Sequence, residues 1–194
     1  AENQAGDPDV RAIILKGEGE MFSAGVDFNS LGAEVGACIG EGGGGGASLR
    51  ALTYRFQQYF NRLEAVEIPI ICAMHGRALG LGIELALACD LTIAAHDCRF
   101  GAPEVLYGSG VVTLLLPYFC GPKRAKEILL TGADRIETEK AHEWRLVNRA
   151  VQEKNLVKRA RELALDIARN DRLAVQIAKS QQLLKGGTEN YLVT

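Results

Sequence analysis

The 194-residue sequence has little of what marks several protein classes. No uninterrupted apolar run is long enough to span a membrane. The net charge of −2 comes without a basic stripe or interleaved aromatic residues, so neither nucleic acid nor an anionic membrane is an expected partner. The polar, acidic start, AENQAGDPD, resembles neither a signal peptide nor a transit peptide. The composition, 47% hydrophobic and 24% charged, is ordinary for a soluble globular protein, and the length predicts one sizeable core.

Motifs for metal binding and for nucleophilic catalysis are also missing. The five cysteines are odd in number and include no C-x-x-C, which disfavours a disulfide framework or a zinc site. We expect reduced, buried thiols in a cytoplasmic or mitochondrial-matrix protein. The three histidines form no HExxH motif, so we predict no metal. The G-x-S-x-G elbow of serine hydrolases is also missing. Cys98 lies two residues from His96, but proximity in sequence is not the geometry that activates a thiol.

Glycine is abundant between residues 32 and 48, where Gly42 to Gly46 are consecutive. The tract contains neither G-x-G-x-x-G after a strand nor a terminal G-K-[ST], so it has no phosphate-binding fingerprint. Because glycine loses the most conformational entropy on ordering, a mobile loop is the favoured interpretation, and a flap over a site is the alternative.

The stretch His75 to Glu104 contains the strongest chemical signal. A small-residue turn, Gly76 to Gly82, leads into a short apolar helix that we expect to begin at about Leu81, with Glu84 in its first turn. A second carboxylate, Glu104, follows Pro103 after another glycine. Apolar surroundings raise the cost of an ionised carboxylate and shift its pKa, so the two glutamates are a candidate general acid/base pair. The alternative is that each glutamate only caps a helix.

A second candidate segment is Phe22 to Asp27, which follows an apolar strand predicted over residues 10–15. Its small residues allow the backbone to approach a ligand, so we expect the N–H of Val26 to point into a cleft. A tight turn without a ligand is the alternative.

The remaining pattern alternates strands with helices, which predicts an α/β protein without internal repeats. Ser48 offers an N-cap for a helix to about Val66, and Pro122 an N1 position for a helix that Gly132 ends. We expect a turn at Gly108 to Gly110 and an apolar stretch from Val111 to Phe119. Further strands are expected at 70–74, 91–95 and 146–151, and further helices at 138–144, 153–170 and 171–184.

Four ordered stretches together resemble the crotonase (enoyl-CoA hydratase/isomerase) superfamily. They are the strand at 10–15 with Phe22-Ser-Ala-Gly-Val-Asp27; Ile68 to Gly76 with Ala78 to Glu84; Ala88-Cys-Asp90 with Phe100 to Glu104; and Gly121 to Lys126 through Leu130-Thr-Gly132, ending in Leu146-Val-Asn148. Order and spacing agree over nearly the whole chain except the glycine tract. From the resemblance we expect that the family's first strand hairpin and leading helix are missing at the N-terminus and that the C-terminal helix is cut short after Thr194. In the family, part of the nucleotide-binding surface lies in those pieces.

The resemblance implies an α/β fold, a crotonase-like spiral of ββα units with a C-terminal helical trimerisation segment. Residues 1–135 correspond to the spiral core and 136–194 to the helical region, which builds homotrimers, often paired into hexamers. The implied substrate is an acyl-CoA thioester, with no cofactor beyond the CoA that the substrate carries.

The resemblance also implies roles for particular residues. The N–H groups of Val26 and Leu81 correspond to the pair that binds the thioester oxygen, and Leu81 lies where a helix begins, so its N–H and the dipole favour negative charge. The catalytic carboxylates correspond to Glu84 and Glu104. Substrate-binding positions carried over with them are Ala24, Gly25, Asp27 and Gly80.

The reaction implied is addition of water across the 2,3 double bond of a trans-2-enoyl-CoA, with Glu104 donating the α proton and Glu84 activating water. A double-bond isomerase, which needs one carboxylate, and a non-catalytic assembly protein are the alternatives. Two departures from the family pattern are an apolar segment at Val111 to Leu116 and Trp144-Arg145 in place of a helix-ending glycine, which predicts a different local cap.

Overall fold

The computed structural model describes residues 7–27, 45–108 and 115–186 of the chain. Its larger sheet has four parallel strands in the order β1 (Ile13–Lys16), β2 (Ile70–Met74), β4 (Leu91–Ala95) and β7 (Arg149–Val151). Ile13 pairs with Ile70, and Ile71 with Leu91. The strands predicted at 70–74 and 91–95 are confirmed to the residue.

The two outer strands are shorter than predicted. β1 starts at Ile13 because its neighbour β2 is preceded by Pro69, which has no N–H to continue the ladder. β7 starts at Arg149. Leu146 N–H closes the preceding helix on Ala141 C=O (2.9 Å), and the Thr92 N–H of β4 donates to the side chain of Asn148 (2.7 Å) instead of to a main-chain carbonyl.

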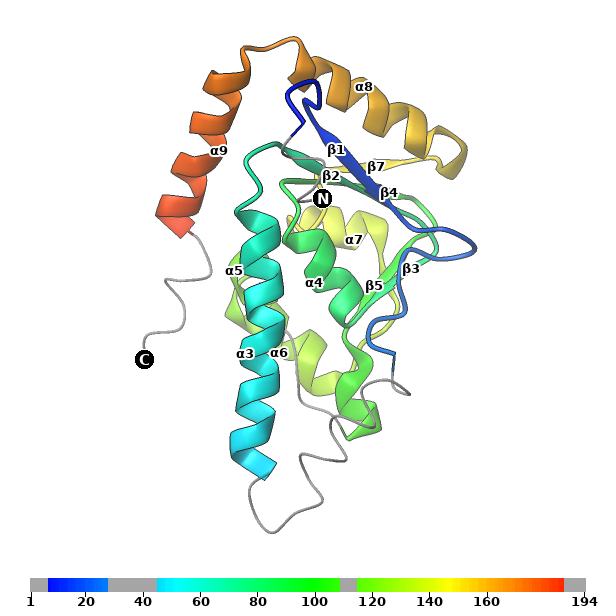
Figure 1. The fold of residues 1–194 in the computed structure, drawn as a ribbon. Helices are drawn as coiled ribbons and strands as arrows, with labels where there is room; N and C mark the ends of the chain where they lie inside the picture. Colours follow the sequence, from blue (N-terminus) through cyan, green and yellow to red (C-terminus); the bar gives the residue numbers. More distant parts are fainter. Residues whose placement is uncertain (1–6, 28–44, 109–114, 187–194) are drawn as a thin grey trace.

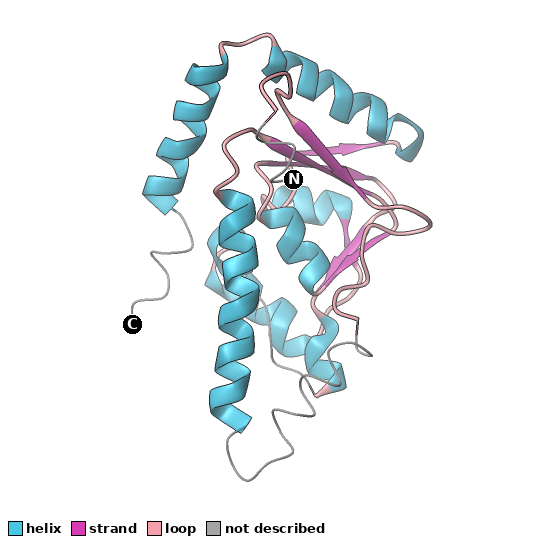
Figure 2. Cartoon of the chain, viewed as in Figure 1, coloured by secondary structure: helices cyan, strands magenta, loops and turns pink. Residues whose placement is uncertain are grey.

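A second, smaller sheet contains β3 (Arg77–Leu79), β5 (Arg99–Gly101) and β6 (Ile136–Glu137) in the order β3-β5-β6. β2 and β3 are followed by helix α4 (Leu81–Leu87), and β4 and β5 are followed by further helices, so each unit places one strand in each sheet. This repetition is the ββα spiral that the resemblance implied, and Figure 2 shows the two sheets with helices around them.

The core lies on both faces of the larger sheet, which explains the continuous apolar runs. Ile70, Cys72 and Met74 belong to the larger cluster with Phe100 and Leu116. The alternate residues Ile71 and Ala73 belong to a smaller cluster with α8 (Leu156–Ala168), which lies along the other face (Figure 1). A strand buried on both faces needs apolar residues at every position, and all five of β2 are buried.

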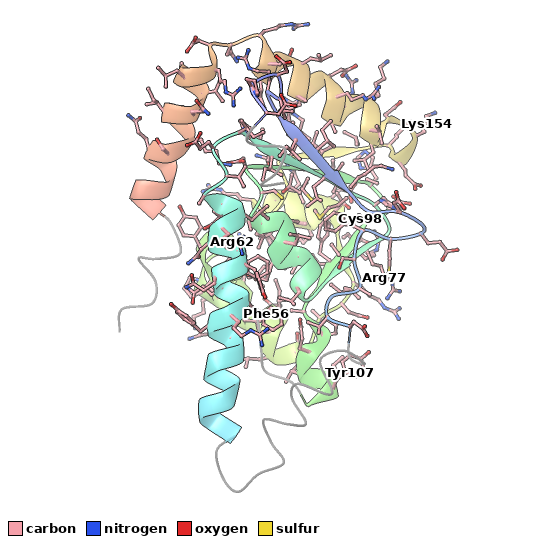
Figure 3. The ribbon with its side chains drawn as sticks, viewed as in Figure 1. Phe56, Arg62, Arg77, Cys98, Tyr107 and Lys154 are labelled. Carbon is pink, nitrogen blue, oxygen red and sulfur yellow. The ribbon has the colours of Figure 1, made fainter. Side chains whose placement is uncertain are left out.

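The remaining helical segments are α3 (Gly45–Glu64), the 3₁₀ turn η1 (Pro103–Tyr107), α5 (Leu116–Cys120), α6 (Pro122–Thr131), α7 (Thr138–Glu143), the 3₁₀ turn η2 (Glu153–Asn155) and α9 (Arg172–Gly186). Figure 3 shows Phe56 on the side of α3 that faces the interior, whereas Lys154 and Arg77 lie at the periphery. No helix in the described ranges has the length and apolar character needed to cross a membrane.

Two helix starts differ from the predictions. α3 begins at Gly45, so Ser48 is not its N-cap, and the last two glycines of the tract belong to the helix instead of a loop. A favourable cap contributes only about 1 kcal/mol, which an extended helix can override. The helix predicted from residue 153 begins as η2 and becomes α-helical at Leu156. Cys38, Gly42 to Gly44 and residues 109–114 lie outside the described residues.

Helix α7 ends in a left-handed turn made by an arginine. Arg145 has φ 67°, and it is the one non-glycine residue with positive φ among those described. Its N–H donates to His142 C=O (3.0 Å), and the Leu146 N–H donates to Ala141 C=O (2.9 Å), the pair of bonds that usually accompanies a glycine. The predicted different local cap is therefore wrong: the helix ends with the usual left-handed turn and its two hydrogen bonds, and an arginine takes the place of the glycine.

Helix α9 is attached to the core by a largely buried ion pair. Lys179 Nζ lies 2.7 Å from Asp90 Oδ2, and the lysine side chain is only 8% exposed. Lys179 also donates to Ile68 C=O (3.1 Å), while Asp90 accepts the Ile70 N–H (2.7 Å). Because both partners are also hydrogen-bonded to main chain, this pair sets where the helix lies against the start of β2.

Candidate active site

The two segments that the sequence predicted as ligand-binding turns lie side by side. Ser23 forms a parallel bridge with Ala78 at the edge of the smaller sheet. Three backbone hydrogen bonds join the segments: Phe22 N–H to His75 C=O (2.9 Å), Ser23 N–H to Arg77 C=O (3.0 Å) and Leu79 N–H to Ser23 C=O (3.0 Å). Residues 22–27 are therefore held against the β3–α4 connection.

Small residues make this close approach possible. A Cβ atom on Gly25 (φ 96°) would lie 2.9 Å from Leu79 O and 3.6 Å from Leu81 N. A Cβ on Gly82 would lie 2.7 Å from the Ser23 Cβ. Side chains at the two glycines would push the segments apart, so glycine here reflects packing as well as backbone freedom.

Helix α4 begins at Leu81, as predicted, and Gly80 precedes it with φ 53° and no side-chain cap. The Gly80 N–H donates to Gly101 C=O (2.9 Å), which ties the start of the helix to β5. Within the described ranges, neither the Leu81 nor the Val26 N–H donates a backbone or side-chain hydrogen bond. Two main-chain donors on adjacent segments, one at a helix N-terminus, form a suitable site for a developing negative charge.

Glu84 lies in the first turn of α4 and is fully buried, with 0% of its surface exposed. Its Oε2 atom accepts the main-chain N–H of Leu115 (2.8 Å), just before α5. Burying a carboxylate without hydrogen bonds would cost several kcal/mol, and the Leu115 N–H offsets part of that cost while fixing the orientation of the side chain. The other carboxylate oxygen, Oε1, is also shielded from solvent.

Glu104 reaches the same helix start from the other side. It lies in η1 and is half-buried. A Cβ atom on Gly80 would lie 2.2 Å from Glu104 Oε1, so the carboxylate rests directly on that glycine. Burial raises the pKa of the Glu104 carboxyl above its usual value, and a hydrogen bond from its own backbone N–H lowers it in part.

The first turn of α4 thus brings together three of the predicted elements: the Leu81 N–H, Glu84 and, across Gly80, Glu104. Ala24 and Asp27, the other carried-over positions, are exposed on the neighbouring segment. Sequence reasoning missed Leu115, because a main-chain donor leaves no signal in residue type. It also missed Cys120, whose pKa is raised mainly by burial and, to a lesser extent, by the negative charge of Glu84.

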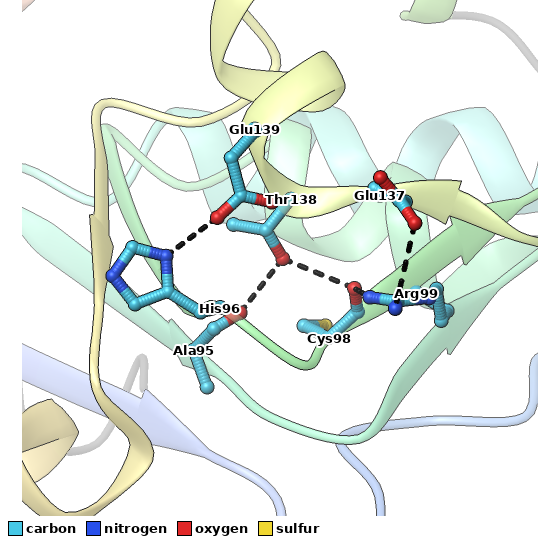
Figure 4. Close-up of polar contacts among 7 residues, drawn as sticks. All are labelled: Ala95, His96, Cys98, Arg99, Glu137, Thr138 and Glu139. Atoms are coloured by element: carbon cyan, nitrogen blue, oxygen red, sulfur yellow. Dashed lines mark hydrogen bonds and ion pairs between the residues drawn. The ribbon is translucent and has the colours of Figure 1, made fainter.

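The neighbouring pair His96 and Cys98 does not form a catalytic site. His96 Nδ1 lies 2.6 Å from Glu139 Oε1 at the surface, and Figure 4 shows its ring turned toward that glutamate. Cys98 is fully buried, and burial raises the pKa of its thiol to about 12, so the nucleophilic thiolate does not form at neutral pH. The Thr138 hydroxyl lies within hydrogen-bond distance of the carbonyls of Ala95 (2.7 Å) and Cys98 (3.0 Å), which gives this corner a structural role.

Comparisons with known proteins identify the family and the fold of the chain. A family model described as enoyl-CoA hydratase/isomerase matches residues 2–188. The chain is 37% identical over 183 residues to a crotonyl-CoA hydratase of Syntrophomonas wolfei, covering 90% of this chain and 64% of that protein. It is 37% identical over 180 residues to a carnitinyl-CoA dehydratase of Citrobacter koseri, covering 89% of this chain and 63% of the relative.

Among solved structures, an enoyl-CoA hydratase/isomerase from Xanthobacter autotrophicus Py2 aligns with a TM-score of 0.83 at 35% identity, covering 98% of this chain and 69% of that one. Because it covers 64% and 63% of the two curated relatives named above, the chain spans somewhat less than two thirds of their length. The match of fold and sequence extends over the segments that build the site. The chain belongs to the enoyl-CoA hydratase/isomerase family.

Proposed function

We propose that this chain carries the active site of an enoyl-CoA hydratase, which adds water across the 2,3 double bond of a trans-2-enoyl-CoA. One observation carries the proposal: two carboxylates, one fully buried and one half-buried, lie at a single helix start beside available main-chain N–H groups. The names of the two curated relatives, a hydratase and a dehydratase of CoA thioesters, support the same reaction in its two directions.

In this proposal the thioester oxygen lies between the N–H groups of Val26 and Leu81. Their hydrogen bonds polarise the carbonyl and withdraw electrons from C3, which becomes the electrophile. Negative charge that accumulates on the oxygen as the enolate forms is stabilised by the two donors and by the α4 dipole. Loss of one such donor typically costs about 10²–10³ in rate. The Leu81 side chain is half-buried against the core, so only its N–H needs to face the substrate.

The carboxylates divide the proton transfers between them. Glu84 accepts a proton from water as the oxygen bonds to C3, and Glu104 donates a proton to C2. The raised pKa of Glu104 favours the protonated form that this donation requires. The product gains one water, and the proton taken up by Glu84 is returned to Glu104 through solvent before the next turnover. No cofactor is needed beyond the CoA of the substrate.

The test compares Glu84→Gln and Glu104→Gln with Glu139→Gln, a matched control on the surface of α7. Hydration of crotonyl-CoA should fall about 10²–10⁴-fold in the first two variants, because each loses a general acid or base, and stay unchanged in the control. Normal hydration by both site variants would refute the proposal. Absence of turnover by the unmodified protein on any enoyl-CoA would instead support a non-catalytic role.

A double-bond isomerase is the second candidate, and the complete burial of Glu84 favours it. If that carboxylate does not reach the substrate, Glu104 alone can carry a proton between C2 and C4 of a 3-enoyl-CoA. Isomerisation of 3-enoyl-CoA that persists in Glu84→Gln but is lost in Glu104→Gln would identify this reaction.

We also propose that the chain assembles into a homotrimer or hexamer. Large apolar side chains exposed on α3, α8 and α9 support an assembly, because contact between copies would remove their surface from water. They include Tyr59 (55% exposed), Leu165 (58%) and Leu173 (63%). Light scattering of the purified protein should give three or six times the chain mass, and a monomer would contradict this.

A further inference from the structure

The side chain of Ser23 contacts both segments that present main-chain N–H groups at the candidate active site. Ser23 is half-buried, and its hydroxyl oxygen accepts the N–H of Gly25 (3.2 Å). The same side chain lies against the first turn of α4, because a Cβ atom on Gly82 would lie 2.7 Å from the Ser23 Cβ and 2.9 Å from its Oγ. One small side chain therefore connects the residue before Val26 to the residue after Leu81.

The main chain of Ser23 is held in place independently of its side chain. Its N–H donates to Arg77 C=O (3.0 Å), and its C=O accepts the Leu79 N–H (3.0 Å). These bonds place Ser23 in register with β3, where it forms the bridge to Ala78. The hydroxyl is thus attached to a fixed position at the edge of the smaller sheet and is a stable reference point for the residues that follow.

The residue that the hydroxyl holds is the one with the least conformational restriction of its own. Gly25 has φ 96°, and a glycine can adopt a wide range of backbone angles. The direction of the Val26 N–H depends on the backbone angles of Gly25, because one peptide unit joins the two residues. A serine hydroxyl that accepts the N–H two residues later fixes the turn between them. The bond therefore restricts the direction in which the Val26 N–H points.

That direction matters because two donors must reach one oxygen. A Cβ atom on Gly25 would lie 3.6 Å from Leu81 N, so the segment already lies against the start of α4. Donors stabilise a developing oxyanion when each lies about 2.7–3.1 Å from it, and rotation of the peptide between Gly25 and Val26 would lose this distance without moving α4. Building on the hydratase reaction proposed above, we propose that Ser23 is a positioning residue whose hydroxyl directs the Val26 N–H toward the thioester oxygen.

The variant Ser23→Ala removes the acceptor but keeps the Cβ that lies against Gly82. We expect kcat for crotonyl-CoA hydration to fall about tenfold, less than the about 10²–10³ typical for complete loss of a donor. KM should change less than about twofold, because the bond to the oxygen strengthens in the transition state. The matched control is Ser180→Ala, which removes a hydroxyl that donates to Ile177 C=O (2.9 Å) on α9 and should leave the rate unchanged.

The carbonyl stretch of bound butyryl-CoA, labelled with a heavy carbon isotope at the thioester carbonyl, reports the geometry directly. This saturated thioester cannot be hydrated, and hydrogen bonds to its oxygen lower the stretching frequency. Infrared difference spectra should show a lower frequency in the unmodified protein and in Ser180→Ala than in Ser23→Ala. A change in stability alone would not move this frequency, and thermal unfolding would establish that all three proteins are folded at the assay temperature.

Equal carbonyl frequencies in Ser23→Ala and the unmodified protein would overturn the proposal, even if the rate fell. It would also be overturned if the unmodified protein did not lower the frequency relative to free butyryl-CoA. The proposed reaction is tested separately, by hydration of crotonyl-CoA by the unmodified protein. An unmodified protein that does not hydrate crotonyl-CoA but polarises butyryl-CoA more strongly than Ser23→Ala does would refute the reaction and support the role of Ser23.

Discussion

Replacing Gly80 by alanine should separate the geometry of the candidate site from the stability of the fold. The added Cβ would lie 2.2 Å from Glu104 Oε1 and 3.1 Å from its Cδ. Real Cβ contacts of this kind are essentially never shorter than 3.0 Å, so the carboxylate must move by roughly 1 Å. The same substitution disturbs the residue that orients the Leu81 N–H at the start of α4.

The substitution lowers both the stability of the fold and the rate of hydration. Alanine at φ 53° costs about 1–3 kcal/mol of backbone strain, so the variant should fold with reduced stability. A displacement of about 1 Å in a catalytic group can cost about 10² in rate, or roughly 2.7 kcal/mol of transition-state stabilisation. We therefore expect kcat for crotonyl-CoA hydration to fall about 100-fold, well beyond any loss of folded protein.

Gly19→Ala is the matched control. Gly19 also has a positive φ (76°), but no atom would lie within 4 Å of a Cβ added there, so the backbone cost remains and the collision does not. Hydration rates, thermal unfolding and KM would be measured for both variants. If Gly80→Ala hydrates crotonyl-CoA at a rate within about threefold of Gly19→Ala, the reasoning that Glu104 acts from its position on Gly80 is wrong.

Three further predictions concern stability. The pKa of Glu104 is higher in the folded state than its ordinary value of 4.5, so its ionisation opposes folding, and stability present at low pH is lost as the pH rises above 4.5. Glu104→Gln should therefore unfold at higher denaturant than the unmodified protein at about pH 7 but not at about pH 4. Arg145→Gly should stabilise by about 0.5–1 kcal/mol, measured by urea unfolding against Arg145→Ala, because glycine relieves the left-handed strain. Lys179→Met should destabilise by about 2 kcal/mol by leaving Asp90 without its cation, and Asp90→Asn in the same chain should recover part of that loss.

The local sequence pattern predicted the bounds of the central strands and the start of α4 well. The strands at 70–74 and 91–95 and the start of α4 at Leu81 agree with the sequence, because each combines a dense apolar run with glycine, proline or polar residues at its ends. The predicted bounds were poorer where a neighbouring element sets where a strand begins, as β2 does for β1 and the end of α7 does for β7. The predicted start of α3 was also wrong, because the helix extends past its expected cap.

By itself, the sequence determined the α/β class, the family, and which two glutamates and which two turns deserve study, since those features lie in residue type and spacing. Only the tertiary structure placed Glu104 against Gly80, gave Glu84 its hydrogen bond from Leu115, and brought Lys179 to Asp90. Each of these contacts joins residues that are far apart in the chain or uses a main-chain donor. Such contacts arise when packed elements bring distant backbone together, and no local pattern of side chains records them.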